Sequence, residues 1–132
     1  MKTKTGPIAA ISIALCALLA VAACSAPTAD VPFPDPTTAT WKDGSFPNRN
    51  NLAQVQPGVS KHQMYELLGP PDFHEGVFHV RVWDYLLRFR KADGVVACQY
   101  QVQFDDDNRV IRTRWKDPEC EQLSAANRNA IQ

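Results

Sequence analysis

Residues 82–104 read VWDYLLRFRKADGVVACQYQVQF, and apolar side chains recur at every second position in both halves of this segment. A period of two is typical of a β-strand that buries one face and exposes the other. The halves are separated by Lys-Ala-Asp-Gly at residues 91–94, and Asp-Gly is a common signal for a hairpin turn. The segment therefore predicts two antiparallel strands, over residues 82–90 and 95–104.

A third strand is expected over residues 110–116, after a polar turn at residues 105–109. Consecutive strands joined by short turns usually lie side by side, so the three strands predict a meander. One face of this sheet is expected to be apolar and mostly aromatic. Its members are Trp83, Tyr85, Leu87, Phe89, Cys98, Tyr100, Val102, Phe104, Ile111, Thr113 and Trp115.

Two short helices are expected before the sheet. Ser60 and Gln63 have the spacing of a capping box, which predicts a helix over residues 61–68 that ends at Gly69 and the prolines after it. A shorter helix over residues 50–56 is stopped by a Pro-Gly pair. The expected fold class is therefore α+β: a two-layer α-α-β-β-β arrangement in which a three-stranded antiparallel meander packs on a helix pair.

The first 24 residues have the features of a bacterial lipoprotein signal peptide. Lys2 and Lys4 form a positive start, residues 8–23 carry no charge, and Cys24 follows Val-Ala-Ala. This order is similar to a lipobox, in which the cysteine receives palmitate-type acyl chains and becomes the new N-terminus. The apolar run is shorter than the about 20 residues that a transmembrane helix needs. The alternatives are an ordinary signal peptide cut before a chance cysteine, or a simple membrane anchor.

The remainder of the chain divides into a tether and a folded domain. With lipid on Cys24 and the non-acidic Ser25 after it, the mature protein is expected at the outer membrane, lipid-anchored on the periplasmic face. Residues 25–46 are rich in Pro and Thr and are expected to form a flexible tether. Within it, Trp41 and Phe46 could dock onto the domain or onto the membrane interface. Residues 47–132 are expected to form the domain.

Composition argues against several classes of function. Loss of the two signal-peptide lysines from the 14 basic residues leaves 12, against 14 acidic residues, whereas nucleic acid would favour a strongly basic surface. His62, His74 and His79 offer no close ligand pair, and the acidic turn at residues 105–108 lacks the Gly and Glu of an EF-hand, so we expect no metal and no cofactor. Because no nucleophile elbow is present either, we do not expect an enzyme.

Cys98 and Cys120 are the thiols that remain, because Cys16 leaves with the signal peptide and Cys24 carries lipid. In the expected register Cys98 lies opposite about residue 116, a few residues before Cys120, which falls in a short last helix. A Cα separation of about 6 Å is then feasible, and exported proteins keep disulfides. We therefore expect a Cys98–Cys120 disulfide rather than a metal site that uses one of the histidines.

The other face of the sheet is polar and positively charged. Glutamines occupy its middle strand, and arginines are expected on both sides of them; the residues are Arg88, Arg90, Gln99, Gln101, Gln103, Arg112 and Arg114. One interpretation is a solubilising face on which Asp84 and the glutamines partner the arginines. The other is a docking site for an acidic partner or an anionic phospholipid. An anionic membrane surface attracts each nearby arginine by about 1 kcal/mol. Its binding residues would be Arg88, Arg90, Gln101, Arg112 and Arg114.

Four motifs in the same order carry a resemblance to a known family. Gly58-Val59-Ser60 with Gln63 has the pattern GxSxxQ, and Leu68-Gly69 with Pro71 has the pattern LGxP. The first strand holds the pattern WxY at residues 83–85, and the second ends in VxFD at residues 102–105. Behind a lipobox, this series resembles the SmpA/OmlA (BamE-like) family of outer-membrane lipoproteins.

The resemblance implies an α-α-β-β-β fold and a non-catalytic accessory role in the assembly and insertion of β-barrel outer-membrane proteins and in envelope integrity. It also implies partners: a BamA-like insertase, a BamD-like helical-repeat lipoprotein and the anionic phospholipid phosphatidylglycerol. The cysteine pair and the short first helix depart from the family pattern. The alternative function is a structural envelope lipoprotein or an inhibitor-like, periplasmic protein-binding module outside the assembly machinery, using the same sheet face.

Overall fold

A computed structural model describes residue 2 and residues 30–74 and 81–126 of the chain. Cys24, His79 and nearly all of the predicted signal peptide lie outside these residues. The chain divides into two units, Met1–Asp30 and Val31–Gln132, and the architecture below is that of the second. Among the described residues, no helix has both the length and the hydrophobicity to cross a bilayer.

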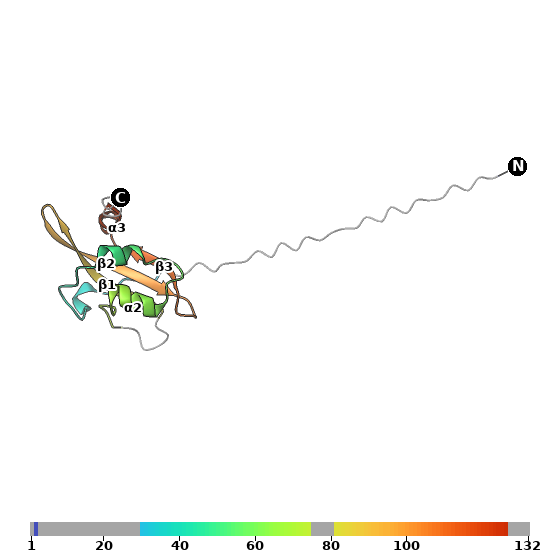
Figure 1. The fold of residues 1–132 in the computed structure, drawn as a ribbon, viewed down its shortest axis with the longest axis horizontal. Coiled ribbons are helices and arrows are strands. Elements are labelled where there is room, and N and C mark those ends of the chain that lie inside the picture. The colour runs from blue at the N-terminus through green and yellow to red at the C-terminus, as the bar shows by residue number, and fades with distance from the viewer. Residues whose placement is uncertain (1, 3–29, 75–80, 127–132) are drawn as a thin grey trace. The chain divides into compact units, whose positions relative to one another are not determined.

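The second unit has the predicted α+β architecture. In chain order its elements are η1 (Pro36–Thr38), α1 (Arg49–Ala53), α2 (Lys61–Leu68), β1 (Val82–Lys91), β2 (Gly94–Phe104), β3 (Val110–Trp115) and α3 (Pro118–Ala126). The strands pair antiparallel in the order β1-β2-β3, which confirms the predicted meander. Figure 1 shows α2 and the green α1 on the same side of the sheet.

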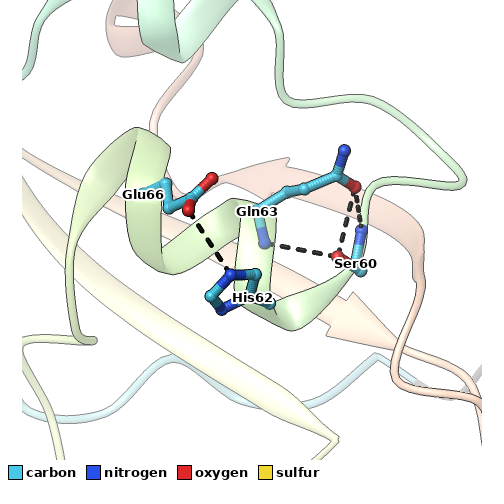
Figure 2. A network of polar contacts seen from close by, with 4 residues as sticks. All are labelled: Ser60, His62, Gln63 and Glu66. Carbon is cyan, nitrogen blue, oxygen red and sulfur yellow. Dashed lines mark hydrogen bonds and ion pairs between the residues drawn. The ribbon is translucent and has the colours of Figure 1, made fainter.

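Helix α2 begins at the predicted capping box. The Ser60 hydroxyl accepts a hydrogen bond from the Gln63 N–H at 3.2 Å, and the Ser60 N–H donates to Gln63 Oε1 at 3.0 Å (Figure 2). The helix ends at Gly69, whose φ of +80° lies in the region that glycine tolerates best. The start and the end of α2 are therefore specified by residues within the segment itself.

The face of the sheet that packs against α1 and α2 is called the inner face, and it holds the main hydrophobic core. The buried residues of this core are Leu52, Met64, Trp83, Tyr85, Leu87, Phe89, Cys98, Tyr100, Val102, Phe104, Val110 and Cys120. Its aromatic rings pack at an angle to one another, with centroids 5.2 Å apart for Trp83 and Phe104. The predicted aromatic core is present.

The prediction that Ile111 belongs to this face is wrong. Gln103 pairs with Arg112, but Phe104 pairs with Val110, so β3 carries one extra residue at this point. Such a bulge reverses the alternation of side chains on its far side. Val110 is consequently 1% exposed in the core, whereas Ile111 is 41% exposed.

The predicted disulfide joins β2 to α3. The Cα atoms of Cys98 and Cys120 are 5.7 Å apart, and both side chains are buried in the main core. The bond fastens the last helix to the middle strand across a separation of 22 residues.

Candidate functional site

The residues predicted to bind a partner lie on the outer face, opposite the inner face. On the β3 side the expected arrangement is confirmed. Gln101 is directly paired with Arg114, and Gln103 with Arg112. Paired side chains on one face of an antiparallel sheet are close neighbours, so each of these glutamines has a guanidinium beside it.

On the β1 side the expected arrangement is wrong, because Asp84, not an arginine, is paired with Gln101. A tight hairpin turn pairs residues at equal distances from it. Arg88 and Arg90 are close to the turn and are paired with Ala97 and Val95. The four arginines therefore form two separate pairs, one beside the glutamines and one near the hairpin end of the sheet.

The glutamines of the outer face are buried. Gln99, Gln101 and Gln103 are 5%, 0% and 2% exposed. Gln99 and Gln101 are bonded to an N-terminal segment, residues 31–45, which we call the strap. Gln99 Nε2 donates to the carbonyl of Pro34 at 2.7 Å, and Gln101 Nε2 donates to the carbonyl of Val31 at 3.3 Å. A partner could reach the Gln101 amide only if this end of the strap moved away.

Arg114 contributes to the same contact. Its Nη2 donates to the carbonyl of Val31 at 2.9 Å, and its guanidinium lies 4.7 Å from the centroid of the Phe33 ring. Hydrogen bonds from a charged donor and cation–π contacts are both favourable at a partly buried site. Arg114 therefore contacts the strap at two points, the Val31 backbone and the Phe33 ring.

Asp84 provides the negative charge beneath the strap. Burial raises the pKa of its carboxyl group above the usual value of 3.8, and the hydrogen bond from Gln101 and the charge of Arg114 oppose that rise. Gln101 Nε2 donates to Asp84 Oδ1 at 3.0 Å. The Asp84–Gln101–Arg114 row is thus a partly satisfied polar network, as expected for buried polar groups in a folded protein.

The strap also covers the outer edge of β1. Ser45 donates its N–H to the Leu86 carbonyl at 3.0 Å and accepts from the Arg88 N–H at 2.8 Å. The N–H of the same Leu86 donates to Asp72 Oδ2 at 2.8 Å, and burial raises the pKa of the Asp72 carboxyl. The outward-facing backbone groups on this part of β1 are therefore paired, which prevents uncontrolled pairing with another strand.

A second, small hydrophobic cluster fixes the strap on the outer face. It consists of Ala39 from the strap, Phe73 and Leu86. Gly44 has φ +66°, and a Cβ atom at that position would lie 2.4 Å from the Leu86 carbonyl oxygen. Only glycine permits both the backbone conformation and the close approach.

The second arginine pair is more accessible. Arg88 and Arg90 lie 5.1 and 4.3 Å from the centroid of the Phe46 ring, which is itself 45% exposed. Trp41, in the turn of the strap, is 67% exposed. Phe46 thus lies on the domain, whereas the Trp41 ring points mostly to solvent. Aromatic rings beside arginines are typical of surfaces that meet a partner or a membrane interface.

The histidines and acidic residues of the described part of the chain were also considered as metal ligands in the sequence, and the structure shows how they are placed. No group of three or more potential metal-ligating side chains is found there. His62 lies 3.4 Å from Glu66 on the exposed side of α2, as Figure 2 shows. The outer face offers guanidinium groups and aromatic rings, which are side chains that suit binding.

Sequence reasoning found the outer-face residues but missed the strap that covers them. The division between tether and domain at residue 46 stays a prediction, as do the lipid on Cys24 and the binding roles of the arginines. Within the predicted tether, however, residues 31–45 contact the sheet. Their local signals are weak: Phe33 and Ala39 are isolated apolar residues among prolines and threonines, and Gly44 could serve any turn.

The chain is similar to a known family and to a named protein. Residues 44–114 match the family described as the outer membrane protein assembly factor BamE domain. The chain is also 27% identical over 70 residues to the protein named outer membrane protein assembly factor BamE from Polynucleobacter necessarius subsp. necessarius (strain STIR1). That alignment covers 52% of this chain and 30% of the relative, so the chain matches less than a third of the relative's length. Because the family match spans more than half of the 132 residues and includes both layers of the fold, the chain belongs to the BamE family.

Proposed function

We propose that this protein is a lipid-anchored, non-catalytic accessory subunit in the assembly of β-barrel proteins in the outer membrane. The observation that carries the proposal is the family match, because residues 44–114 contain α1, α2, β1, β2 and nearly all of β3. The name of the relative assigns outer-membrane protein assembly to a protein that shares this region. The outer face offers binding chemistry that suits such a role.

The proposed anchor is lipid on Cys24, at the end of the lipobox-like sequence. Two or more acyl chains hold a protein firmly at a bilayer, because each buried CH₂ group contributes about 0.8 kcal/mol. Val31, the first strap residue bonded to the sheet, is only seven positions after Cys24. A peptide of that length spans at most about 25 Å. The domain would therefore be held close to the membrane surface.

The proposed contact surface is the accessible part of the outer face, around Phe46, Arg88 and Arg90. Each arginine near an anionic membrane surface contributes about 1 kcal/mol of attraction, and Arg also pairs well with acidic groups of proteins. Arg112 and Arg114 stay candidates for the same role, although Arg114 also bonds the strap.

Affinity purification tests the proposal. The full-length chain with a C-terminal tag is expressed in its host, extracted in mild detergent and purified, and co-purifying proteins are identified by mass spectrometry. BamA-like and BamD-like subunits are expected with the wild type. They should be strongly depleted with Cys24→Ala, which removes the proposed acylation site. Recovery of the lipidated chain without any assembly subunit would contradict the proposed role and favour a structural or inhibitor-like envelope lipoprotein.

A paired substitution tests the contact surface. Arg88→Gln/Arg90→Gln should reduce recovery of the subunits, whereas Lys42→Gln removes a positive charge from the exposed turn of the strap and should leave recovery unchanged. Equal recovery with all three proteins would show that Arg88 and Arg90 make no contact that matters for the complex.

A further inference from the structure

Described residues outside the sheet are bonded to part of each of its two edges. The outward-facing backbone groups in the middle of β1 are bonded to Ser45 and Asp72. At the start of β3, Val110 accepts from the Gly58 N–H at 2.8 Å and donates to the Val59 carbonyl at 2.8 Å. Proteins cover strand edges in this way because a row of unpaired N–H and C=O groups recruits other strands.

In the described part of the chain, no other segment is hydrogen-bonded to the outer side of the second half of β3. The Lys116 N–H donates to the Gln99 carbonyl at 3.1 Å, which places the backbone groups of the even-numbered residues of this segment toward β2. Because these groups alternate in an antiparallel pair, the N–H and C=O groups of Thr113 and Trp115 point away from the sheet. Within residues 30–74 and 81–126, no hydrogen bond to these groups from outside the sheet is found.

A cleft runs along this open edge. Its volume is about 540 Å³, and its lining includes Thr113 and Trp115 together with Phe33 of the strap, Arg49 of α1 and Glu121 of α3. A volume of this size is in the range of pockets that hold small ligands or short peptide segments. The cleft therefore places open backbone groups and side chains for recognition in one location.

The lining of the cleft is positively charged. Arg49, Arg114 and Lys116 are its basic residues, and Glu121 is its acidic residue. The Arg49 guanidinium lies 5.4 Å from the centroid of the Phe89 ring, and its Nη1 atom is buried without a hydrogen-bond partner among the described residues. A buried charged donor without an acceptor is unusual in a folded protein. A carboxylate that entered the cleft would supply the missing acceptor, in the fork geometry that arginine prefers.

We propose that this edge binds an extended, acidic segment of a partner protein, which adds a fourth strand beside Thr113 and Trp115. The added backbone would pair with the open groups of β3, and its acidic side chains would meet Arg49 on one face and Arg114 and Lys116 on the other. Such strand addition derives affinity from the main chain and specificity from alternate side chains. The inference goes beyond the proposed role in barrel assembly and does not rest on it.

The test uses the full-length protein in detergent micelles and a fluorescein-labelled peptide, SEEFVEES, which carries acidic and apolar side chains on both faces of a strand. Fluorescence anisotropy measures its affinity, and ¹⁵N NMR locates it. The peptide is expected to bind at least about tenfold more tightly than SKKFVKKS, and the amide signals of Thr113 and Trp115 should shift. N-methylation of successive peptide residues should weaken binding at alternate positions, by about fivefold or more at each blocked hydrogen bond.

The affinity of the peptide for three charge variants gives a second test, which does not rely on any single substitution. Arg49→Gln is expected to weaken binding about tenfold, since a hydrogen bond to a charged group is lost. Glu121→Gln removes the acidic lining residue and should strengthen binding, while Lys42→Gln, away from the cleft, should have no effect. If Arg49→Gln proves unstable, tighter binding by Glu121→Gln beside unchanged binding by Lys42→Gln still distinguishes the cleft from the rest of the surface.

Several outcomes would overturn the proposal. No measurable affinity for SEEFVEES would do so, and so would amide shifts around Arg88 and Arg90 instead of β3. An N-methyl scan without alternation would rule out strand addition. Sedimentation that shows a dimer dissolved by the peptide would assign the edge to a second copy of this chain, and shifts of Thr113 and Trp115 caused by phosphatidylglycerol vesicles but not by the peptide would assign it to lipid.

Discussion

Removal of the disulfide is the perturbation whose cost can be worked out most directly. The bond closes a loop with a separation of 22 residues, and the loss of loop entropy in the unfolded chain corresponds to about 3 kcal/mol at 25 °C. In a domain of about 100 residues, each kcal/mol moves the melting temperature by about 4–8 °C. The double substitution Cys98→Ala/Cys120→Ala is therefore expected to lower the melting temperature by about 12–24 °C. Alanine is chosen because both cysteines are buried in the core, where a serine hydroxyl would need a new hydrogen-bond partner.

Thermal unfolding followed by far-ultraviolet circular dichroism measures this shift, with and without excess dithiothreitol. The reductant should destabilise the wild type by a similar amount and leave the double variant unchanged, so the variant is the control for the reductant. If the wild type melted at the same temperature in both buffers, and the variant melted with it, the bond would not be constraining the unfolded chain and the entropy argument would fail.

Three further predictions concern the strap, a buried carboxyl group and the cap of α2. Gly44→Ala should lower the free energy of unfolding in urea by about 1–3 kcal/mol, because its Cβ would meet the Leu86 carbonyl at 2.4 Å. Gly58→Ala is the matched control, since Gly58 also has a positive φ but has nothing within 4 Å of the added Cβ. Equal losses in the two variants would show that the contact with Leu86 has no energetic role. Burial raises the pKa of Asp84 above 3.8, so its contribution to stability is full below 3.8 and is lost as the pH rises through the folded pKa. Asp84→Asn should accordingly be more stable than the wild type at pH 7 and have a flatter stability profile between pH 3 and 7, and superimposable profiles would refute this. Ser60→Ala should lower the free energy of unfolding by about 1 kcal/mol, as measured by urea titration, and an unchanged midpoint would mean that the capping box does not stabilise α2.

The strap engages part of the positive charge on the outer face. Arg114 bonds the backbone of Val31 and stacks on Phe33, so its charge serves an intramolecular contact. Arg88 and Arg90 instead lie beside the exposed ring of Phe46 at the other end of the sheet. A partner that meets this face from solvent would therefore encounter the hairpin end first.

Local sequence was sufficient for the elements whose signals lie within a few residues of one another. The capping box of α2 involves Ser60 and Gln63, three positions apart, and the hairpin follows from one Asp-Gly turn between two alternating segments. The disulfide could be predicted as well, because antiparallel register places Cys98 near the end of β3 once the turns are known. For the helix and the hairpin the specifying residues are neighbours along the chain, and for the disulfide two short connections bring together cysteines that are 22 positions apart.

Tertiary structure decided which residues cover the outer face and where the register of β3 shifts. An alternating pattern states that a strand has two different faces, but it does not state what lies on the polar one. The hydrogen bonds that bury Gln99 and Gln101 join residues 65 and 70 positions apart, and the bulge that turns Ile111 outward lies where Val110 pairs with the loop at residues 58–59. Both features depend on which distant backbone groups reach the buried amides and the strand edges. The periodicity of a single segment carries no information about those distant groups.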